Sequence, residues 1–190
     1  GSIERLKLGR ELQIVFQDPY TSLDPRQTGW SCLREVIQLH FPDQTRSQVE
    51  SRILELGSQV GLSTEQLLVR PNSLSGGQRQ RVAIARALAS EPQAIILDEA
   101  VSGLDVSIQA QILNLLMDIK RETGVAYLFI SHDLAVIRQM AGYVIVMESG
   151  RVVEEGETAQ VLDRPKENYT RMLRESVPGP GWSPKRRNLA

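Results

Sequence analysis

The stretch from Leu74 to Ala87 reads L-S-G-G-Q-R-Q-R-V-A-I-A-R-A, and the fold of the chain is best understood by working outward from it. Two glycines after a serine let the backbone approach a ligand closely, and the run rich in Ala and Arg behind them predicts a helix. The first amides of that helix favour an anion. Ser75 and Gln78 also have the spacing of a capping box, so a well-capped surface helix without a ligand is the alternative.

The composition predicts one ordinary core, or one core with a small lobe, because 41% of the 190 residues are hydrophobic. The longest apolar run, Val125 to Ile130, is too short to insert directly into a membrane. A single cysteine, Cys32, excludes an internal disulfide framework and a Cys-clustered metal site. The net charge of -1 gives no reason to expect nucleic acid, and the basic cluster 185–187 is interpreted as part of a solvated, disordered tail.

Before the stretch 74–87, a short β-type run from Gln13 to Phe16 ends at Gln17-Asp18-Pro19. Gln17 therefore stands at a strand end, where open α/β sheets bind ligands, although a lone Gln there is often only a polar exit residue. Residues 30 to 70 predict a small helical lobe, with a second capping box at Thr45 and Gln48. The lone His40 in this lobe is given no role.

After the stretch 74–87, Ala94 to Leu97 is apolar on both faces and predicts the middle strand of a parallel sheet. Asp98 and Glu99 at the end of this strand would be costly to bury without a cation, so they predict a cation site. The alternative is that they are only acidic residues at the point where the strand leads into a turn. Asp105 is placed to cap a helix running to about Glu122. Its predicted buried stripe consists of Ile108, Ile112, Leu115, Leu116 and Ile119.

The next apolar run, Val125 to Ile130, predicts another buried strand, and Ser131-His132-Asp133 follows it. A histidine at the end of the strand next to the one that ends in Asp98-Glu99 can reach the same ligand. Further on, segments 143–147 and 151–155 predict a hairpin that closes the sheet edge.

Five of these motifs, in this order, resemble the Q-loop, signature, Walker B strand, D-loop and switch histidine of ABC-type ATPases. Two segments resemble those of the ATPases of oligopeptide, dipeptide and nickel importers. They are the string Q-I-V-F-Q-D-P-Y-T-S-L-D-P-R and the tail around Asn168. The resemblance implies an α/β fold: a partial P-loop ATPase core, with a mostly parallel sheet flanked by helices, and an inserted α-helical subdomain. It divides the chain into 1–19 (start of the core with the Q-loop), 20–74 (helical subdomain leading into the signature), 75–163 (remaining core) and 164–190 (importer-type extension and flexible tail).

The resemblance also implies the roles of single residues in a complete, dimeric subunit. Glu99, His132 and Gln17 would be catalytic, and Asp98 with Gln17 would hold Mg²⁺ on the bound ATP. Asp105 would be the D-loop residue that crosses the subunit interface. The signature residues that would complete the ATP site of the partner subunit are Ser75, Gly76, Gly77 and Gln78.

One departure from the family pattern is definite: the sequence has no G-x-x-x-x-G-K-[S/T] loop, and none of its 14 glycines is followed by lysine. The chain is therefore interpreted as a subunit that lacks its N-terminal Walker A region. Alone, it is expected to bind ATP poorly, because helix-dipole terms of about 0.3–1 kcal/mol do not retain a nucleotide. It is also expected to expose core surface and an unpaired strand edge unless something covers them.

The leading hypothesis is an ATP-binding and ATP-hydrolysing subunit of an ABC importer for peptides or a related small solute. Its partners would be a second ATP-binding subunit and transmembrane permease subunits, and it would lie in the cytoplasm on the inner face of the cell membrane. One alternative is a non-catalytic scaffold that docks on membrane subunits or lends its signature to an intact partner. Another is an ABC protein of the translation or DNA-repair type, against which the Q-loop string and the tail argue.

Overall fold

The computed structural model describes residues 2–18 and 22–176, and this part of the chain forms two compact units. The first unit ends at Ile130, and the second begins at Ser131. The four segments expected from the sequence differ from this division, and their boundaries stay predictions. Pro19 and the basic cluster 185–187 lie outside the described residues.

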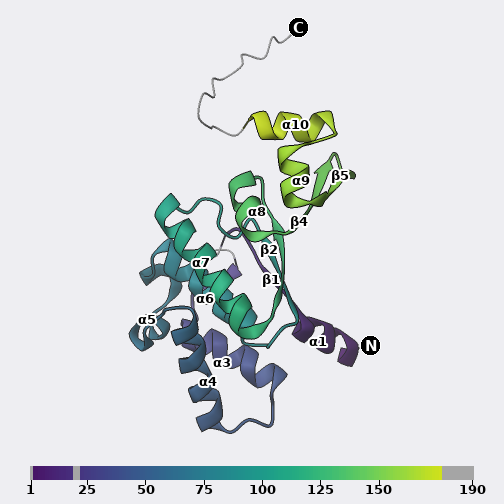
Figure 1. Cartoon of the computed structure of the whole chain (residues 1–190). Coiled ribbons are helices and arrows are strands. Elements are labelled where there is room, and N and C mark those ends of the chain that lie inside the picture. Colours follow the sequence, from purple (N-terminus) through teal and green to yellow (C-terminus); the bar gives the residue numbers. More distant parts are fainter. Residues whose placement is uncertain (1, 19–21, 177–190) are drawn as a thin grey trace. The chain divides into compact units, whose positions relative to one another are not determined.

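A three-stranded parallel sheet lies at the centre of the first unit (Figure 1). Its strands are β1 (Leu12–Val15), β2 (Ala94–Asp98) and β3 (Ala126–Ile130), in the order β1-β2-β3. The middle position of β2 confirms the prediction for the apolar run at 94–97, since an interior strand of a parallel sheet carries apolar side chains on both sides. The first strand lies one residue earlier than predicted, because its ladder with β2 ends at the pair Val15 and Leu97.

The helices of the first unit begin with α1, which precedes β1. The predicted helical lobe follows, and its helices gather at one end of the unit in Figure 1. The bounds of these elements are α1 (Ser2–Glu11), α3 (Gly29–His40), α4 (Arg46–Gln59), α5 (Thr64–Leu68) and the 3₁₀ turn η1 (Pro71–Ser73). The predicted capping box of α4 is present, because the Gln48 side chain accepts the amide of Thr45 at 2.8 Å and the Thr45 side chain accepts that of Gln48.

Two further helices follow the lobe in the first unit. They are α6 (Gly76–Leu88), which packs against β1 and the lobe, and α7 (Val106–Thr123), which packs against α6. The predicted stripe of α7 is buried except for Ile108, which is half-buried because it lies in the exposed first turn, and Leu113 joins the buried set. The sequence-based assignment of Ile108 to the buried stripe was therefore wrong.

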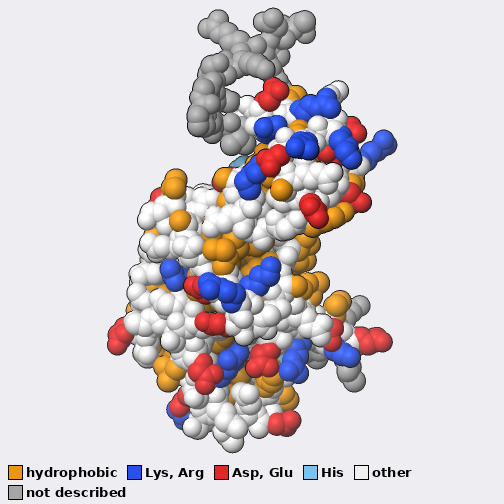
Figure 2. All heavy atoms as spheres, viewed as in Figure 1, with side chains coloured by type: hydrophobic (Ala, Val, Ile, Leu, Met, Phe, Trp, Pro, Cys, Tyr) orange, Lys and Arg blue, Asp and Glu red, His pale blue; other side chains and the backbone are white. Residues whose placement is uncertain are grey.

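One face of the sheet is covered and the other is open. Side chains alternate across a strand, and on one side Ile95 and Leu97 are fully buried. On the other side Ile14, Leu128 and Ile130 are 39%, 55% and 47% exposed. The prediction of a buried strand at 125–130 was therefore wrong, because within the described residues only one face of β3 is covered. The prediction of exposed core surface is confirmed, and Figure 2 shows hydrophobic side chains at the edge of this unit.

The second unit contains the predicted hairpin, β4 (Tyr143–Glu148) and β5 (Arg151–Glu157), with helices α8 (Leu134–Met140), α9 (Thr158–Asp163) and α10 (Asn168–Glu175). Ser149 and Gly150 form its tight turn with positive φ at both positions, 50° and 77°. The hairpin was expected to close the edge of the parallel sheet, and this expectation was wrong. Its two strands pair with each other and form a two-stranded antiparallel sheet.

Within the described ranges, none of the helices combines the length and the apolar character that crossing a membrane requires.

Candidate functional site

The signature stretch places the start of α6 at Ser75. The Ser75 hydroxyl accepts the amide of Gln78 at 3.3 Å, and the Gln78 side chain accepts the amide of Ser75 at 2.8 Å. Both halves of the predicted capping box are therefore present. The first amides of a helix have no carbonyl partner within the helix, and a ligand on the amides of Gly76 and Gly77 stays a prediction.

The two signature glycines also allow α6 to approach α7 closely. A Cβ added to Gly77 would lie 2.6 Å from Cγ2 of Ile108, and one added to Gly76 would lie 3.6 Å from Cδ2 of Leu104. The glycines were explained from the sequence by a ligand that needs close approach. At Gly77 the close neighbour is a side chain of the same unit, so the signature and the segment that carries Asp105 pack together.

Buried Arg79 stabilises the turn that leads into the signature. Its Nη1 donates to the carbonyl oxygens of Pro71, at 3.1 Å, and of Leu74. Arg86, two turns further along α6, donates to the carbonyl oxygen of Ser22 and so ties the helix to the segment after β1. Sequence reasoning treated these arginines only as helix formers. No local pattern in the sequence points to these contacts, because they depend on how the segments before α6 fold back onto it.

The carboxylates of the Walker B pattern stand at the end of β2. Val15 of β1 pairs with Leu97, and Asp98 pairs with Ile130 of β3. Because the strands are parallel, Gln17, Asp98 and Glu99 all leave the sheet at the same edge, where open α/β sheets bind ligands. Asp98 and Glu99 are half-buried and Gln17 is exposed.

Glu99 has an unusual backbone conformation, with φ at +48°. Its amide donates to the carbonyl oxygen of Ile130 at 2.9 Å. Ser102 contacts it from the other side, through the Ser102 amide and hydroxyl. Positive φ is uncommon for a residue other than glycine. Strained positions of this kind cluster at functional sites.

Asp105 performs the capping role that the sequence predicts. Its Oδ1 accepts the amide of Ile108 at 2.9 Å and so starts α7. The helix starts at Ser75 and at Asp105 lie on elements that pack together, because Gly77 contacts the Ile108 side chain. A second role of Asp105 across a subunit interface stays a prediction.

His132 follows β3 by two residues and belongs to the second unit. The loop around it is ordered by Asp133, whose Oδ1 accepts the amide of Ala135 at 2.9 Å and whose own amide donates to the Ser131 hydroxyl at 3.0 Å. The expected approach of His132 to the ligand of Glu99 stays a prediction. The remaining histidine, His40, has its pKa lowered by burial and by the charge of Arg10, and it stands in the lobe at the end of α3.

Mg²⁺ suits the donors at the end of the sheet. Within residues 2–18 and 22–176, no group of three His, Cys, Asp or Glu side chains is arranged to hold a metal. Mg²⁺ is commonly held by one or two carboxylates together with substrate phosphates and water. The half-buried carboxylate of Asp98 and the amide oxygen of Gln17 fit that mode.

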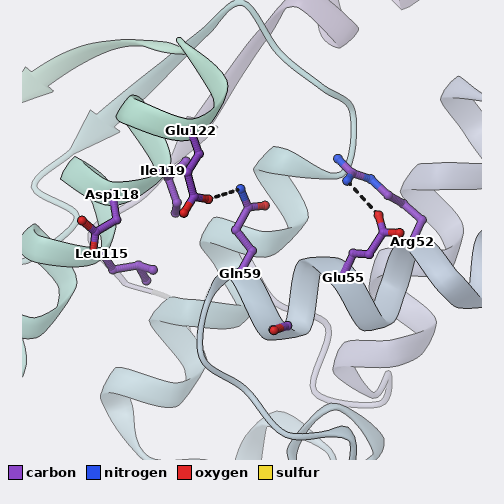
Figure 3. A pocket seen from close by; sticks show the side chains of 8 residues that line it. Arg52, Glu55, Gln59, Leu115, Asp118, Ile119 and Glu122 are labelled. Atoms are coloured by element: carbon purple, nitrogen blue, oxygen red, sulfur yellow. Dashed lines mark hydrogen bonds and ion pairs between the residues drawn. The ribbon is translucent and has the colours of Figure 1, made fainter.

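A groove of about 620 Å³ lies elsewhere in the first unit, between α4 and α7 (Figure 3). Some of its lining side chains contact one another: Arg52 pairs with Glu55 at 3.4 Å, and Gln59 donates to Glu122 at 3.5 Å. Three of its lining side chains are acidic and one is basic, which disfavours phosphate. The groove is therefore a poor nucleotide site, unlike the edge at the end of β2.

Known proteins resemble this chain over the region that carries these motifs. The sequence model of the family described as "ABC transporter" matches residues 2–102. The glutathione import ATP-binding protein GsiA of Pectobacterium atrosepticum is 50% identical over 90% of this chain and 27% of its own length. The oligopeptide transport ATP-binding protein OppD of Mycobacterium tuberculosis is 46% identical over 95% of this chain and 29% of its own length. The chain thus spans between a quarter and a third of these relatives.

Two solved structures share the fold. One is cbiO1 from Clostridium perfringens, part of the ABC transporter complex cbiONQ, with a TM-score of 0.74 and 28% identity over 84% of this chain and 62% of that chain. The other is a dimeric ATP-binding cassette in a post-hydrolysis state bound to ADP and Pi, with a TM-score of 0.71 and 31% identity over 83% of this chain and 68% of that chain. These similarities confirm the predicted α/β ATPase fold.

Proposed function

This chain belongs to the ABC transporter family, and we propose that it forms the signature-bearing part of an ATP-hydrolysing subunit of an importer for glutathione, peptides or a related small solute. The observation that supports the proposal most is the packing of Gly77 on Ile108, which holds the signature against the segment of Asp105. That segment begins at the strand end where Asp98 and Glu99 stand. Because the relatives GsiA and OppD are ATP-binding proteins of import and transport systems, they favour an ATPase over a scaffold.

In the proposed reaction, water attacks the terminal phosphate of ATP in line with the bond that breaks. Glu99 orients that water and takes its proton. Asp98 and Gln17 would hold Mg²⁺, which supplies positive charge to the phosphates. The amides at the start of α6 would bind the terminal phosphate of an ATP held by a second subunit, as helix starts bind anions. His132 would contact the same phosphate from the loop after β3.

The proposed site needs a phosphate-binding loop with its lysine, which these 190 residues do not contain. We therefore propose that activity arises in a longer protein that joins this chain to such a loop and pairs with a second ATP-binding subunit. Permease subunits would place that protein at the cytoplasmic face of the membrane.

Calorimetric titration of Mg-ATP tests the proposal. The 190-residue chain alone is expected to give no binding heat, and the chain joined to a G-x-x-x-x-G-K-[S/T] segment is expected to bind. In the joined protein, Glu99→Gln should lower kcat by about 100-fold or more and leave ATP binding intact, as for loss of a general base. Glu122→Gln, at an exposed position of α7, is the matched control. Tight binding by the short chain, or normal turnover by the Glu99 variant, would contradict the assignment.

A further inference from the structure

The backbone of Glu99 is held in its strained form by three hydrogen bonds. Its amide donates to the carbonyl oxygen of Ile130 at 2.9 Å. Its carbonyl oxygen accepts both the amide and the hydroxyl of Ser102, each at 2.9 Å. A positive φ at a residue with a Cβ persists only when its surroundings over-determine it. The bonds from Ile130 and Ser102 provide that constraint on both sides of the residue.

The Ser102 hydroxyl also contacts the side chain of Glu99, because its oxygen lies 3.3 Å from Oε2 of the carboxylate. A hydroxyl has one proton, so it donates mainly to the nearer carbonyl and shares its proton weakly with the carboxylate. Ser102 thus contacts both the backbone and the reactive end of the same residue. A serine that only closed a turn would need the carbonyl bond alone.

Ser102 also lies in the segment that reaches the signature. Two residues further on, Leu104 lies against Gly76 of α6, and Ile108 lies against Gly77. The segment that begins at Ser102 is therefore packed against α6 through Leu104 and Ile108. A rigid attachment of this kind is what keeps a catalytic group within a fraction of an ångström of its working position.

We propose that Ser102 is a positioning residue for Glu99: it fixes the left-handed backbone of Glu99 and directs its carboxylate. This inference rests on the proposed function, in which Glu99 orients the attacking water. Ser102 acts through Glu99, whose carbonyl oxygen and carboxylate its hydroxyl contacts. Loss of its hydroxyl removes one of the three bonds to the Glu99 backbone and the contact with Oε2, so the carboxylate leaves its working position while the nucleotide contacts persist.

The test uses the complete ATPase, in which this chain is joined to its phosphate-binding loop. The variants are Ser102→Ala, which removes the hydroxyl, and Ser102→Thr, which keeps it; Ser51→Ala, at an exposed position of α4, is the matched control. Ser102→Ala should lower kcat about tenfold and keep KM within about twofold, because misplacement of a catalytic group affects the transition state more than binding. Ser102→Thr should retain kcat within about twofold.

Several results separate this inference from the proposed function. An inactive Glu99→Gln variant beside a fully active Ser102→Ala variant overturns the positioning role and leaves the proposed function standing. A fully active Glu99→Gln variant overturns both. A Ser102→Ala variant in which KM rises as kcat falls, with a lower melting temperature, indicates a purely structural serine and overturns the inference. If Ser102→Ala does not fold, Ser102→Thr decides, because loss of kcat in a folded variant that keeps the hydroxyl contradicts the proposal.

Discussion

The two faces of the parallel sheet differ although the same three strands make both. On the covered face, Ile95 and Leu97 are fully buried, and Tyr127 and Phe129 of β3 lie beside them with their rings edge to face at 5.9 Å. On the open face, Leu128 remains more than half exposed. A parallel sheet normally has both faces covered. Within the described residues of the first unit, one face is covered, with α6 packed against β1, and the other face is open.

The largest expected effect comes from truncating a side chain on the covered face. Leu97→Ala should lower the free energy of unfolding by about 2–5 kcal/mol, because it removes buried methyl groups and leaves a cavity. Leu128→Ala, on the open face, should change it by less than about 1 kcal/mol, since an exposed side chain loses little on truncation. Urea unfolding of both variants measures the contrast. Equal effects would mean that the open face is covered in solution.

A second contrast tests how tightly the covered side is packed. Gly77→Ala should destabilise the protein by about 1–3 kcal/mol, because the added methyl group meets Ile108 and packed cores resist extra volume. Gly76→Ala is the matched control, since its methyl group would be in ordinary contact with Leu104. It should be neutral or stabilising by up to about 1 kcal/mol, because alanine favours a helix more than glycine does. Thermal unfolding distinguishes the two, and similar melting temperatures would contradict the close approach of α6 and α7.

The smallest expected effect concerns Tyr127 on the covered face. Burial raises the pKa of the Tyr127 phenol, so the folded state favours the neutral form. The resulting stability is fully present below the ordinary tyrosine pKa of about 10 and is lost as the pH rises above it. Within the part of the chain that the structure describes, the buried Tyr127 hydroxyl has no hydrogen-bond partner.

Tyr127→Phe should therefore be neutral or stabilising by about 1 kcal/mol at pH 7, because it removes an unsatisfied hydroxyl. It should also weaken the loss of stability between pH 9 and pH 11. Urea midpoints of the wild type and the variant across this range give the difference. If the stability of the two proteins falls equally over this pH range, the Tyr127 hydroxyl is exposed to water and the prediction is wrong.

Local sequence patterns predicted the features that depend on near neighbours in the chain. The capping boxes at Thr45 and Ser75 and the cap at Asp105 follow from side chains that reach amides three residues away. The apolar run of β2 predicted a central strand because both of its sides are apolar. These patterns also predicted which residues gather at the edge of the sheet, although their roles in catalysis stay proposals.

Features that depend on distant segments were missed or predicted wrongly. The open side of β3 was expected to be buried, because its apolar residues look the same whether or not a layer covers them. The left-handed backbone of Glu99 has no local signal, since glutamate ordinarily avoids it. The buried contacts of Arg79 with the turn before α6 likewise depend on how η1 folds back onto that helix.

The sequence by itself determined the strands of the parallel sheet, the hairpin, the helix starts at Thr45, Ser75 and Asp105 and the family of the chain, because periodicity, capping and motif spacing act over a few residues. The tertiary structure decided that one sheet face is open, that Gly77 packs against Ile108, and that Ser102 holds Glu99 in a strained conformation. These features arise from contacts between separate elements, whose free energies depend on shape and distance in the folded chain and leave no regular pattern in the sequence.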